Sequence, residues 1–533
     1  MTGILACPEP PAAIAARGIF ERDGSALDAA VAAAFAQGVA LPLGCGVAGM
    51  AHILVTRPGW AAPRFLNASV AVGSGGRPDV FQAGFLGRSE RAGRYLIEGD
   101  RNQFGYASIM TPGFVRGMEA VRALGDARLS WADLVSPAAE IAGRGFDVYP
   151  YLARYYTFEG SDRPGYPDVF RKLHADPSAS ARYLPGGRPA AAGEMLRQPE
   201  YARTLARLGD EGPDSFYRGT IASQISEDFE RHGALVTSAD LAGYAVQHLQ
   251  PVAGTFRDLT VYSSPPPGHG VVLVCMLNLV EPLDLAGLGW NTADYVETIA
   301  WATRTAFADC MPYLADPEFV AVPVEWLGSK ARAEEAQRER ALEAASHAWT
   351  SSNEHTTHVS SADGAGNVVS ITHSIGSIAG AGVVTRELGF LYNNFMGHFN
   401  PLPGYHNSIA PGKRMGGGSP AIVYREGAPW LAIGSSGGSR LISAVFQTLL
   451  NVVVFGMTLQ DAVAAPRVHS ESGRRIYVES ALVPIAETLR RRGYEVEVTG
   501  YMGCNQAVEL RAGGLAAGSD PRGGQGIAAW RGR

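Results

Sequence analysis

The stretch "NEHTTHVSSADGAGNVVSITHS", residues 353–374, decides the fold of this 533-residue chain. It contains two runs of alternating residues, "THVSSAD" and "GNVVSITHS", which are joined through the turn-rich residues 363–367. Alternation with a period of two is typical of strands, and a short loop of Gly, Asp and Asn between two strands is typical of a hairpin. The sequence therefore predicts a β-hairpin that begins at two threonines, Thr356 and Thr357.

Helical patterns lie on the N-terminal side of this hairpin, and strand patterns lie mostly after it. We predict helices over residues 25–42, 130–146 and 292–317, where N-cap residues precede apolar stretches. Further strands are predicted in "GFLYNN", "SPAIVYREGAPWLAIGS" and "RIYVE". Because no Pro/Ser-rich linker or low-complexity tract divides the chain, we expect one large intertwined domain.

Composition limits the classes of function. The chain is 46% hydrophobic and 18% charged with a net charge of -6, which is typical of a well-packed globular protein and excludes a basic nucleic-acid binder. No run approaches about 18 apolar residues, so we expect no membrane span. Five cysteines without a CxxC pair predict neither a disulfide framework nor a zinc site. His355 and His358 would not share a face of a strand, so we expect no metal and no cofactor.

The N-terminus reads "MTGILACPEPPAAIAARGIFERDGS". It lacks a basic region followed by roughly 7 to 15 apolar residues, and Pro8, Pro10 and Pro11 interrupt its apolar character. We therefore expect a cytoplasmic protein.

Two sites offer a hydroxyl nucleophile. Ser436 in "GSSGG" (434–438) fits G-x-S-x-G between a predicted strand and helix, but an acid and then a histidine must follow it. The only later histidine is His469, and Asp461 precedes it by only eight residues, which leaves no room for the intervening elements. Gly437 and Gly438 are more informative, because their amides at a helix N-terminus could form an oxyanion hole; a simple tight turn is the alternative.

The second candidate is Thr356. If the preceding peptide bond were broken, the freed α-amino group, with a pKa of about 8, could take the proton of its own hydroxyl. Two threonines at the start of a strand are more often structural, so this pattern alone is weak.

A series of motifs runs along the chain in this order: "GSALDAAVAAAFAQGVALPLGCGVAGMAHILV", "DLAGY", "YSSPPPGHG", "YLADPEFVAVP", the TTH element, "NSIAPGKR", "SPAIV", "GSSGGSR", "AAPRVH" and "GSDPRGGQG". With these motifs, the chain resembles the γ-glutamyltransferase family of N-terminal-nucleophile hydrolases over nearly its full length. The resemblance implies an α+β fold, a four-layer αββα sandwich. It also implies a proenzyme that cuts itself into a large segment, 1–355, and a small segment, 356–533, which remain together as a heterodimer or a dimer of such heterodimers.

The same resemblance implies the catalytic residues. The cut falls between His355 and Thr356, and Thr356 becomes the nucleophile. Thr357 and Ser374 would assist it, although the family usually has threonine at the position of Ser374. The amides of Gly437 and Gly438 would stabilise the oxyanion.

The residues with which the family binds glutamate are altered in this chain. Phe395 and His398 in "NNFMGHF" replace a glutamine and the aspartate that binds the substrate α-amino group. The other altered positions are Gly376 for an asparagine, Gly416 and Gly417 for paired serines, and Ser69 near the place of the carboxylate-binding arginine. Candidate replacements for that arginine are Arg101, Arg94 and Arg414.

We therefore expect an amide hydrolase for a small molecule other than a γ-glutamyl peptide, with Phe395, His398 and Tyr405 lining an apolar site. Three alternatives remain open. The chain could be a conventional γ-glutamyltransferase or glutathione hydrolase, a C–C bond hydrolase that removes an oxalyl group in specialised metabolism, or an unprocessed, non-catalytic relative that serves as a binding protein.

Overall fold

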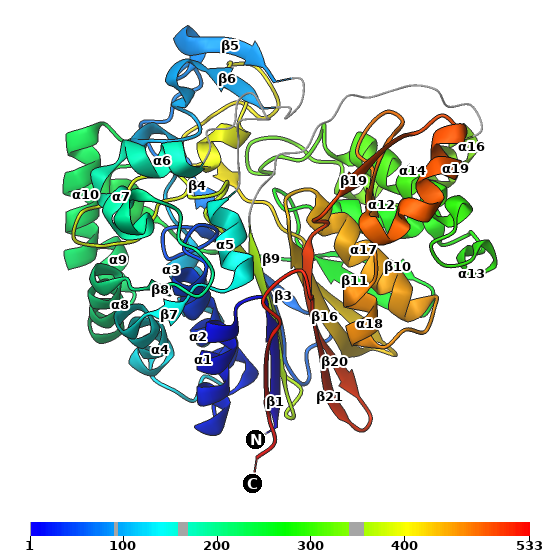
Figure 1. Cartoon of the computed structure of the whole chain (residues 1–533), viewed down its shortest axis with the longest axis horizontal. Coiled ribbons are helices and arrows are strands. Elements are labelled where there is room, and N and C mark those ends of the chain that lie inside the picture. Colours follow the sequence, from blue (N-terminus) through cyan, green and yellow to red (C-terminus); the bar gives the residue numbers. More distant parts are fainter. Residues whose placement is uncertain (1, 90–93, 158–168, 341–355, 533) are drawn as a thin grey trace.

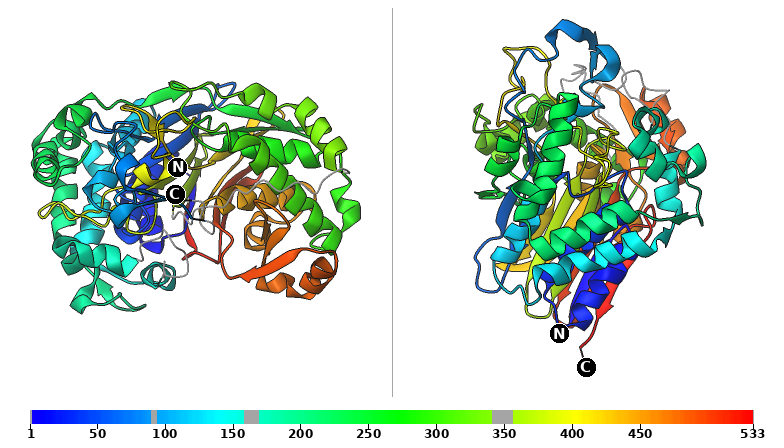
Figure 2. Two further views of the ribbon diagram at one scale, coloured as in Figure 1. Left: turned by 90° about the horizontal axis from the view of Figure 1, so that it is seen from above. Right: turned by 90° about the vertical axis from the view of Figure 1, so that its left-hand side faces the viewer.

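Two stacked β-sheets form the centre of the protein, and helices cover both outer faces (Figure 1). The computed structural model describes residues 2–89, 94–157, 169–340 and 356–532. Figure 2 shows the two helical layers on opposite sides of the sheets, with the two chain ends close together. The predicted four-layer αββα sandwich is confirmed.

The first sheet has the predicted hairpin at its centre. Its seven strands follow the order β22 (Gly526–Trp530), β1 (Gly3–Cys7), β12 (Thr357–Asp363), β13 (Val368–Ser374), β2 (Met50–Thr56), β3 (Arg64–Ala68) and β9 (Gln247–Leu249). β12 and β13 pair antiparallel with Thr357 opposite His373. The Asp363 carboxylate accepts hydrogen bonds from the backbone of Ala365 and Asn367, which explains why the chain turns there.

The second sheet has six strands. They follow the order β10 (Val252–Phe256), β11 (Leu259–Ser263), β15 (Ala421–Arg425), β16 (Ala428–Ser436), β20 (Cys504–Arg511) and β21 (Gly514–Ser519). Apolar side chains of both sheets, such as Leu54, Ala362 and Ile422, meet in the space between them. Strands from before and after residue 355 occur in both sheets, so neither segment forms a sheet alone.

The first sheet is covered by helix α2 (Ala26–Ala40), of which every residue is buried. Ser25 caps it through a reciprocal capping box with Asp28. The helix continues through Gly38, where a Cβ atom would lie only 3.0 Å from the Cα atom of Gly46. Around α2 pack α1 (Pro10–Glu21), α3 (Phe114–Ala123), α4 (Trp131–Arg144) and α8 (Pro199–Glu211).

The second sheet is covered by α12 (Gly270–Val280), α14 (Ala293–Cys310) and α17 (Arg440–Val453). The hydroxyl of Thr292 caps α14, as predicted, but the helix ends at Cys310 and not at residue 317. Within the described ranges, no helix has both the length and the apolar character to cross a membrane.

The remaining elements surround this sandwich. The strands are β4 (Val70–Ala71), β5 (Phe85–Arg88), β6 (Tyr95–Ile97), β7 (Phe146–Asp147), β8 (Met195–Leu196), β14 (Arg414–Met415), β17 (Val468–His469), β18 (Arg475–Glu479) and β19 (Glu495–Thr499). The helices are α5 (Pro150–Tyr156), α6 (Val169–Ala175), α7 (Pro177–Tyr183), α9 (Asp214–Tyr217), α10 (Thr220–His232), α11 (Ser238–Gly243), α13 (Leu285–Leu288), α15 (Val324–Leu327), α16 (Lys330–Glu339), α18 (Leu459–Ala464) and α19 (Val483–Arg491).

The prediction of a strand in "GFLYNN", residues 389–394, is wrong. This segment makes only isolated bridges, one of them between Ala48 and Tyr392. Single backbone hydrogen bonds to separate segments hold it, such as the one from Ala381 N–H to the carbonyl of Tyr392. The Asn393 side-chain amide adds bonds to the carbonyls of Ala48 and Met110, which a ladder would otherwise satisfy.

Packing of the hairpin against α2 can be tested at Ile371, a fully buried residue of β13. We expect Ile371→Ala to lower the free energy of unfolding by about 2–5 kcal/mol, because it leaves a cavity in a close-packed core. Ile371→Val, the matched control, should cost about 0.5–1.5 kcal/mol. Urea unfolding measures both, and equal stability of the alanine variant and the wild type would contradict this packing.

Candidate active site

Thr356 lies immediately before β12 and is 2% exposed. Thr357 pairs with His373, so the register, continued by one residue, places Thr356 opposite Ser374. Cross-strand neighbours on one face have Cβ atoms about 4.5–5.5 Å apart. The Ser374 hydroxyl accepts the Gly376 N–H at 2.9 Å, which orients it. The structure thus brings together the predicted nucleophile and the predicted assisting serine, whereas His355 lies outside the described residues.

Thr357 points the other way. Successive side chains of a strand point to opposite faces. His358 faces the second sheet, since a Cβ on Gly434 would lie 2.2 Å from its ring. By the same alternation, Thr356 faces the second sheet and Thr357 faces α2. The hydroxyl of Thr357 donates to Glu9 at 2.6 Å, so the structure does not bring it to Thr356.

The predicted oxyanion glycines lie in the turn from β16 to α17. Gly437 has φ +123° and Gly438 has φ +64°, both in the region that favours glycine. A Cβ on Gly437 would also lie 2.9 Å from the Cα atom of Gly503. The turn precedes the N-terminus of α17, where backbone N–H groups lack helical acceptors. This geometry provides donors for a developing negative charge.

The alternative serine nucleophile is held elsewhere. The Ser436 hydroxyl is fully buried and lies 3.0 Å from Tyr501 Oη and 3.3 Å from Tyr151 Oη. His469 instead contacts Ser443 at 2.6 Å and Glu471 at 2.5 Å. The structure does not bring Ser436 and His469 together, so a Ser-His pair is absent at this turn.

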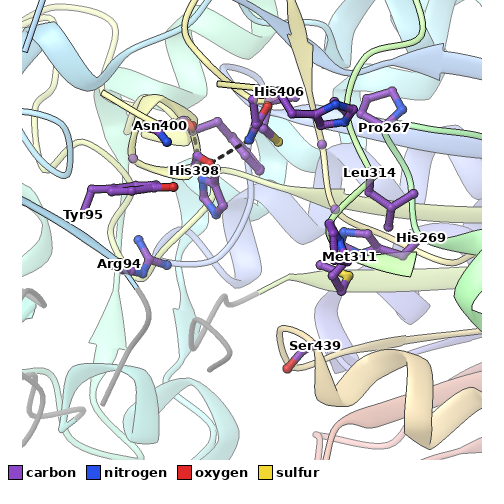
Figure 3. A pocket seen from close by; sticks show the side chains of 18 of the residues that line it. Arg94, Tyr95, Pro267, His269, Met311, Leu314, His398, Asn400, His406 and Ser439 are labelled. Carbon is purple, nitrogen blue, oxygen red and sulfur yellow. Dashed lines mark hydrogen bonds between the residues drawn. The ribbon is translucent and has the colours of Figure 1, made fainter. Parts of the chain in front are cut away.

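A cavity of about 310 Å³ lies next to the start of α17, where Ser439 and Ile442 line it (Figure 3). Thr356, Ser374, Gly437 and Gly438 are not among its lining residues. Four of the predicted substrate-binding residues line it: Phe395, His398, Gly416 and Gly417. Tyr405 lines it as well. Arg94 and Tyr95 lie on one side of it, and His269, Met311 and Leu314 on the other (Figure 3). Within the described ranges, no three His, Cys, Asp or Glu side chains are grouped to hold a metal ion.

The charge of this cavity is unusual. Arg88 and Arg94 line it, and none of the described lining residues is acidic. Arg94 is 5% exposed and donates to Gln103 Oε1. Behind the wall, the Glu471 carboxylate accepts a hydrogen bond from the lining residue Ser439 and pairs with His469. The described lining therefore contributes two guanidinium groups and no carboxylate.

Ser69 lies behind the cavity wall and not in it. A Cβ on Gly416 would lie 2.7 Å from Ser69 Oγ, so these two predicted residues are neighbours. Ser69 is fully buried; its hydroxyl donates to Asn67 at 2.6 Å and accepts from His52 at 2.8 Å. Ser69 is therefore committed to interactions within the protein.

Three other candidates lie away from the cavity lining. Gly376 has φ +98°, and a Cβ there would lie 2.3 Å from Asn394 Oδ1, so no side chain fits at this position. Arg101 is exposed, and Arg414 donates to Tyr244 Oη and the carbonyl of Ala245. Of the three arginines considered from the sequence, only Arg94 lines the cavity.

Sequence reasoning missed two polar residues beneath the hairpin. Glu9 follows β1, and Gln37 lies on α2; both are fully buried. Gln37 Nε2 donates to Glu9 Oε2 at 2.6 Å and to Thr357 Oγ1 at 2.9 Å, and Gln37 Oε1 accepts from His373 at 2.9 Å. The available signal was a single amide inside an otherwise Ala- and Val-rich helix.

Burial shifts the titration of these groups. Burial raises the pKa of Glu9 from 4.5 to about 7, although hydrogen bonds from Thr357 and Gln37 oppose the shift. Burial likewise lowers the pKa of His358 and of His373 to about 3, so both rings are neutral near pH 7.

Known proteins are similar to this chain over most of its length. Residues 12–530 match the family model described as Gamma-glutamyltranspeptidase. The chain is 35% identical to the Acylase ACY 1 proenzyme of Pseudomonas sp. (strain V22), covering 93% of this chain and 87% of that protein. It is 31% identical to the Glutathione hydrolase proenzyme of Escherichia coli (strain K12), covering 98% and 90%. The crystal structure of cephalosporin acylase from Bacillus halodurans superposes with a TM-score of 0.88 at 29% identity, covering 100% and 96%.

The buried carboxyl of Glu9 predicts a pH dependence of stability. Because its pKa is raised from 4.5 to about 7 on folding, its stabilising contribution is complete below pH 4.5 and is lost as the pH rises through 7. The full loss amounts to about 3 kcal/mol. The free energy of unfolding, measured with urea at pH 5.5 and 8.5, should change less between the two pH values in Glu9→Gln than in the wild type. The exposed Glu21→Gln is the control, and an unchanged difference in Glu9→Gln would contradict the assignment.

Proposed function

Since this chain belongs to the γ-glutamyltranspeptidase family, we propose that it cuts itself before Thr356 and then hydrolyses an amide of a small molecule through an acyl-enzyme. Members of the family are enzymes, and relatives that match nearly the whole chain carry the word proenzyme or acylase in their names. The observation that carries the choice of substrate is the cavity, which has two arginines and no carboxylate among its described lining residues.

The proposed chemistry begins with the freed α-amino group of Thr356. It takes the proton of the Thr356 hydroxyl, and the oxygen attacks the substrate carbonyl carbon. The tetrahedral oxyanion accepts hydrogen bonds from the amides of Gly437 and Gly438, each worth about 3–4 kcal/mol in the transition state. The ammonium returns its proton to the departing amine. A water molecule, deprotonated by the α-amino group of Thr356, then attacks the ester and releases the acid and free Thr356.

Ser374 fits a supporting role in this scheme. Its hydroxyl lies across the ladder from Thr356 and is oriented by the Gly376 N–H. From that position it can hydrogen-bond the free amine and direct the lone pair of the nitrogen toward the Thr356 hydroxyl. Serine carries the same hydroxyl as the threonine that the family usually has at this position, so Ser374 retains this capacity.

The substrate we propose is an amide whose acyl group has an apolar body and a negatively charged end. Phe307, Met311 and Phe395 would contact the body, and the charged end would face the wall that contains Arg88 and Arg94. A γ-glutamyl group carries an additional ammonium. Where the family has an aspartate for that ammonium, this chain has His398, and the Glu471 carboxylate is already paired with His469. A buried ammonium without a carboxylate binds weakly.

Self-cleavage has a direct test. Denaturing electrophoresis of the purified wild type should show two fragments, residues 1–355 and 356–533, whereas Thr356→Ala should show one band. Thr356→Ser is the matched control; it retains a hydroxyl and should be cut. An intact wild-type chain without hydrolase activity would contradict the proposal and favour the non-catalytic binding protein.

Substrate charge can be tested with two anilides that differ only in the ammonium group. We expect kcat/KM for glutaryl-p-nitroanilide to exceed that for γ-glutamyl-p-nitroanilide by about 10- to 100-fold, the value of one charge-assisted hydrogen bond. His398→Asp should lower the ratio of these two kcat/KM values, because it supplies a carboxylate for the ammonium of the γ-glutamyl group. Equal or faster turnover of the γ-glutamyl anilide would instead support a conventional glutathione hydrolase.

A further inference from the structure

We propose that Glu9 and Gln37 form a clamp that holds the start of β12 against the end of β13 and thereby positions Thr356 for self-cleavage and for turnover. The inference rests on the proposed function, since it concerns the geometry of the same nucleophile. Glu9 and Gln37 are positioning residues, because neither lies on the face of the sheet that carries Thr356.

The clamp joins four elements. Glu9 follows β1, Gln37 is on α2, Thr357 begins β12, and His373 is near the end of β13; all four side chains are fully buried. Thr357 and His373 are direct cross-strand partners. The single amide of Gln37 contacts both of them, through Nε2 to Thr357 at 2.9 Å and through Oε1 to His373 at 2.9 Å. One side chain therefore fixes the separation and register of this pair.

Glu9 completes the clamp from the other side. One carboxyl oxygen accepts the Thr357 hydroxyl and the other accepts the Gln37 amide, both at 2.6 Å. Gln37 Nε2 also approaches the carbonyl of His358 at 3.2 Å, so the backbone of β12 is held as well. Among the described residues, Glu9 forms no ion pair, and its two hydrogen bonds are its anchors.

The pair next to the clamp is Thr356 and Ser374. Adjacent residues of a strand are about 3.4 Å apart, so the clamp lies one residue from the nucleophile. Cleavage would make Thr356 a chain terminus, and a terminus is poorly ordered unless neighbouring residues tie it down. The first side chain after the terminus that is tied to another element is Thr357. A displacement of about 1 Å at a reacting atom can cost about 100-fold in rate.

The surroundings of Glu9 make its titration a specific readout. The groups that interact with its charge are Cys7 of β1, Cys45, Tyr149, Tyr151 and Tyr155 of the α5 region, and Cys504 of β20. His373 faces the same network through Gln37 and stays neutral. None of these groups carries a positive charge near pH 7, and burial raises the pKa of Glu9 to about 7. Ionisation of Glu9 therefore changes the clamp within the assay range.

The test compares near-isosteric variants of one contact. Thr357→Val removes only the hydroxyl, Thr357→Ser keeps it, and Glu9→Gln places an amide donor against the Gln37 donor. We expect Thr357→Val and Glu9→Gln each to lower the rate of self-cleavage and kcat by about 10- to 100-fold, with KM within about twofold. Thr357→Ser should remain within about threefold of the wild type. Because both changes break one network, the double variant should be no slower than the slower single variant.

The pH profile of kcat separates positioning from general loss of stability. The wild type should show two ionisations, one near pH 7 from Glu9 and one near pH 8 from the Thr356 α-amino group, and Glu9→Gln should show only the second. Both profiles are measured at 25 °C on protein whose circular dichroism matches the wild type. The exposed Glu21→Gln is the control and should retain the wild-type profile. If Glu9→Gln is insoluble, the comparison of Thr357→Val with Thr357→Ser carries the test.

Three results would overturn the clamp. The first is a self-cleavage rate and kcat of the single variants within twofold of the wild type, and the second is a change confined to KM. The third is a double variant in which the two losses of rate add. Failure of the proposed function looks different, because the wild type itself would then remain uncut and inactive.

Discussion

The antiparallel pairing of β12 with β13 is the constraint on which the site depends. A slip of one residue in a strand sends every side chain to the opposite face. The observed register sets Thr357 opposite His373, and so directs these two toward α2 and Thr356 with Ser374 toward the second sheet. Both faces of this central hairpin are buried, which leaves no tolerance for an alternative register. The same hydrogen bonds therefore determine the core and the chemistry.

Polar groups buried under this hairpin must find partners within the protein, because an unpaired buried donor or acceptor costs about 1–3 kcal/mol. Glu9, Gln37, Thr357 and His373 satisfy one another beside a large cluster of apolar side chains. A network of this kind rigidifies the elements that it joins. Its position directly beneath the start of β12 is what connects the helical layer to the site.

The cavity is lined by segments from both sides of residue 355. The wall near Gly416 is formed by glycine backbone, and Ser69 behind it is occupied by His52 and Asn67. At the same time, the β5–β6 hairpin brings Arg94 to the opposite side, and the described lining residues lack a carboxylate. The threonine end of β12 lies on a different element from all of these lining residues.

The sequence by itself determined the hairpin, the Ala-rich helix and the glycine turn, because each depends on local patterns: alternation, a capping residue and a strand-to-helix turn. Through its resemblance to a family, it also indicated the four-layer sandwich and four of the residues that line the cavity. It failed at residues 389–394, where contacts with distant carbonyls replace a strand, and it gave no sign that Thr357 turns away from Thr356 toward Glu9. Only the tertiary structure decided which arginine reaches the cavity and which acid lies beneath the hairpin. Arg94 and Arg101 are seven residues apart in sequence, yet of the two it is Arg94 that lines the cavity. Glu9 is more than 300 residues from Thr357, whose hydroxyl donates to it. No local sequence pattern encodes either of these placements.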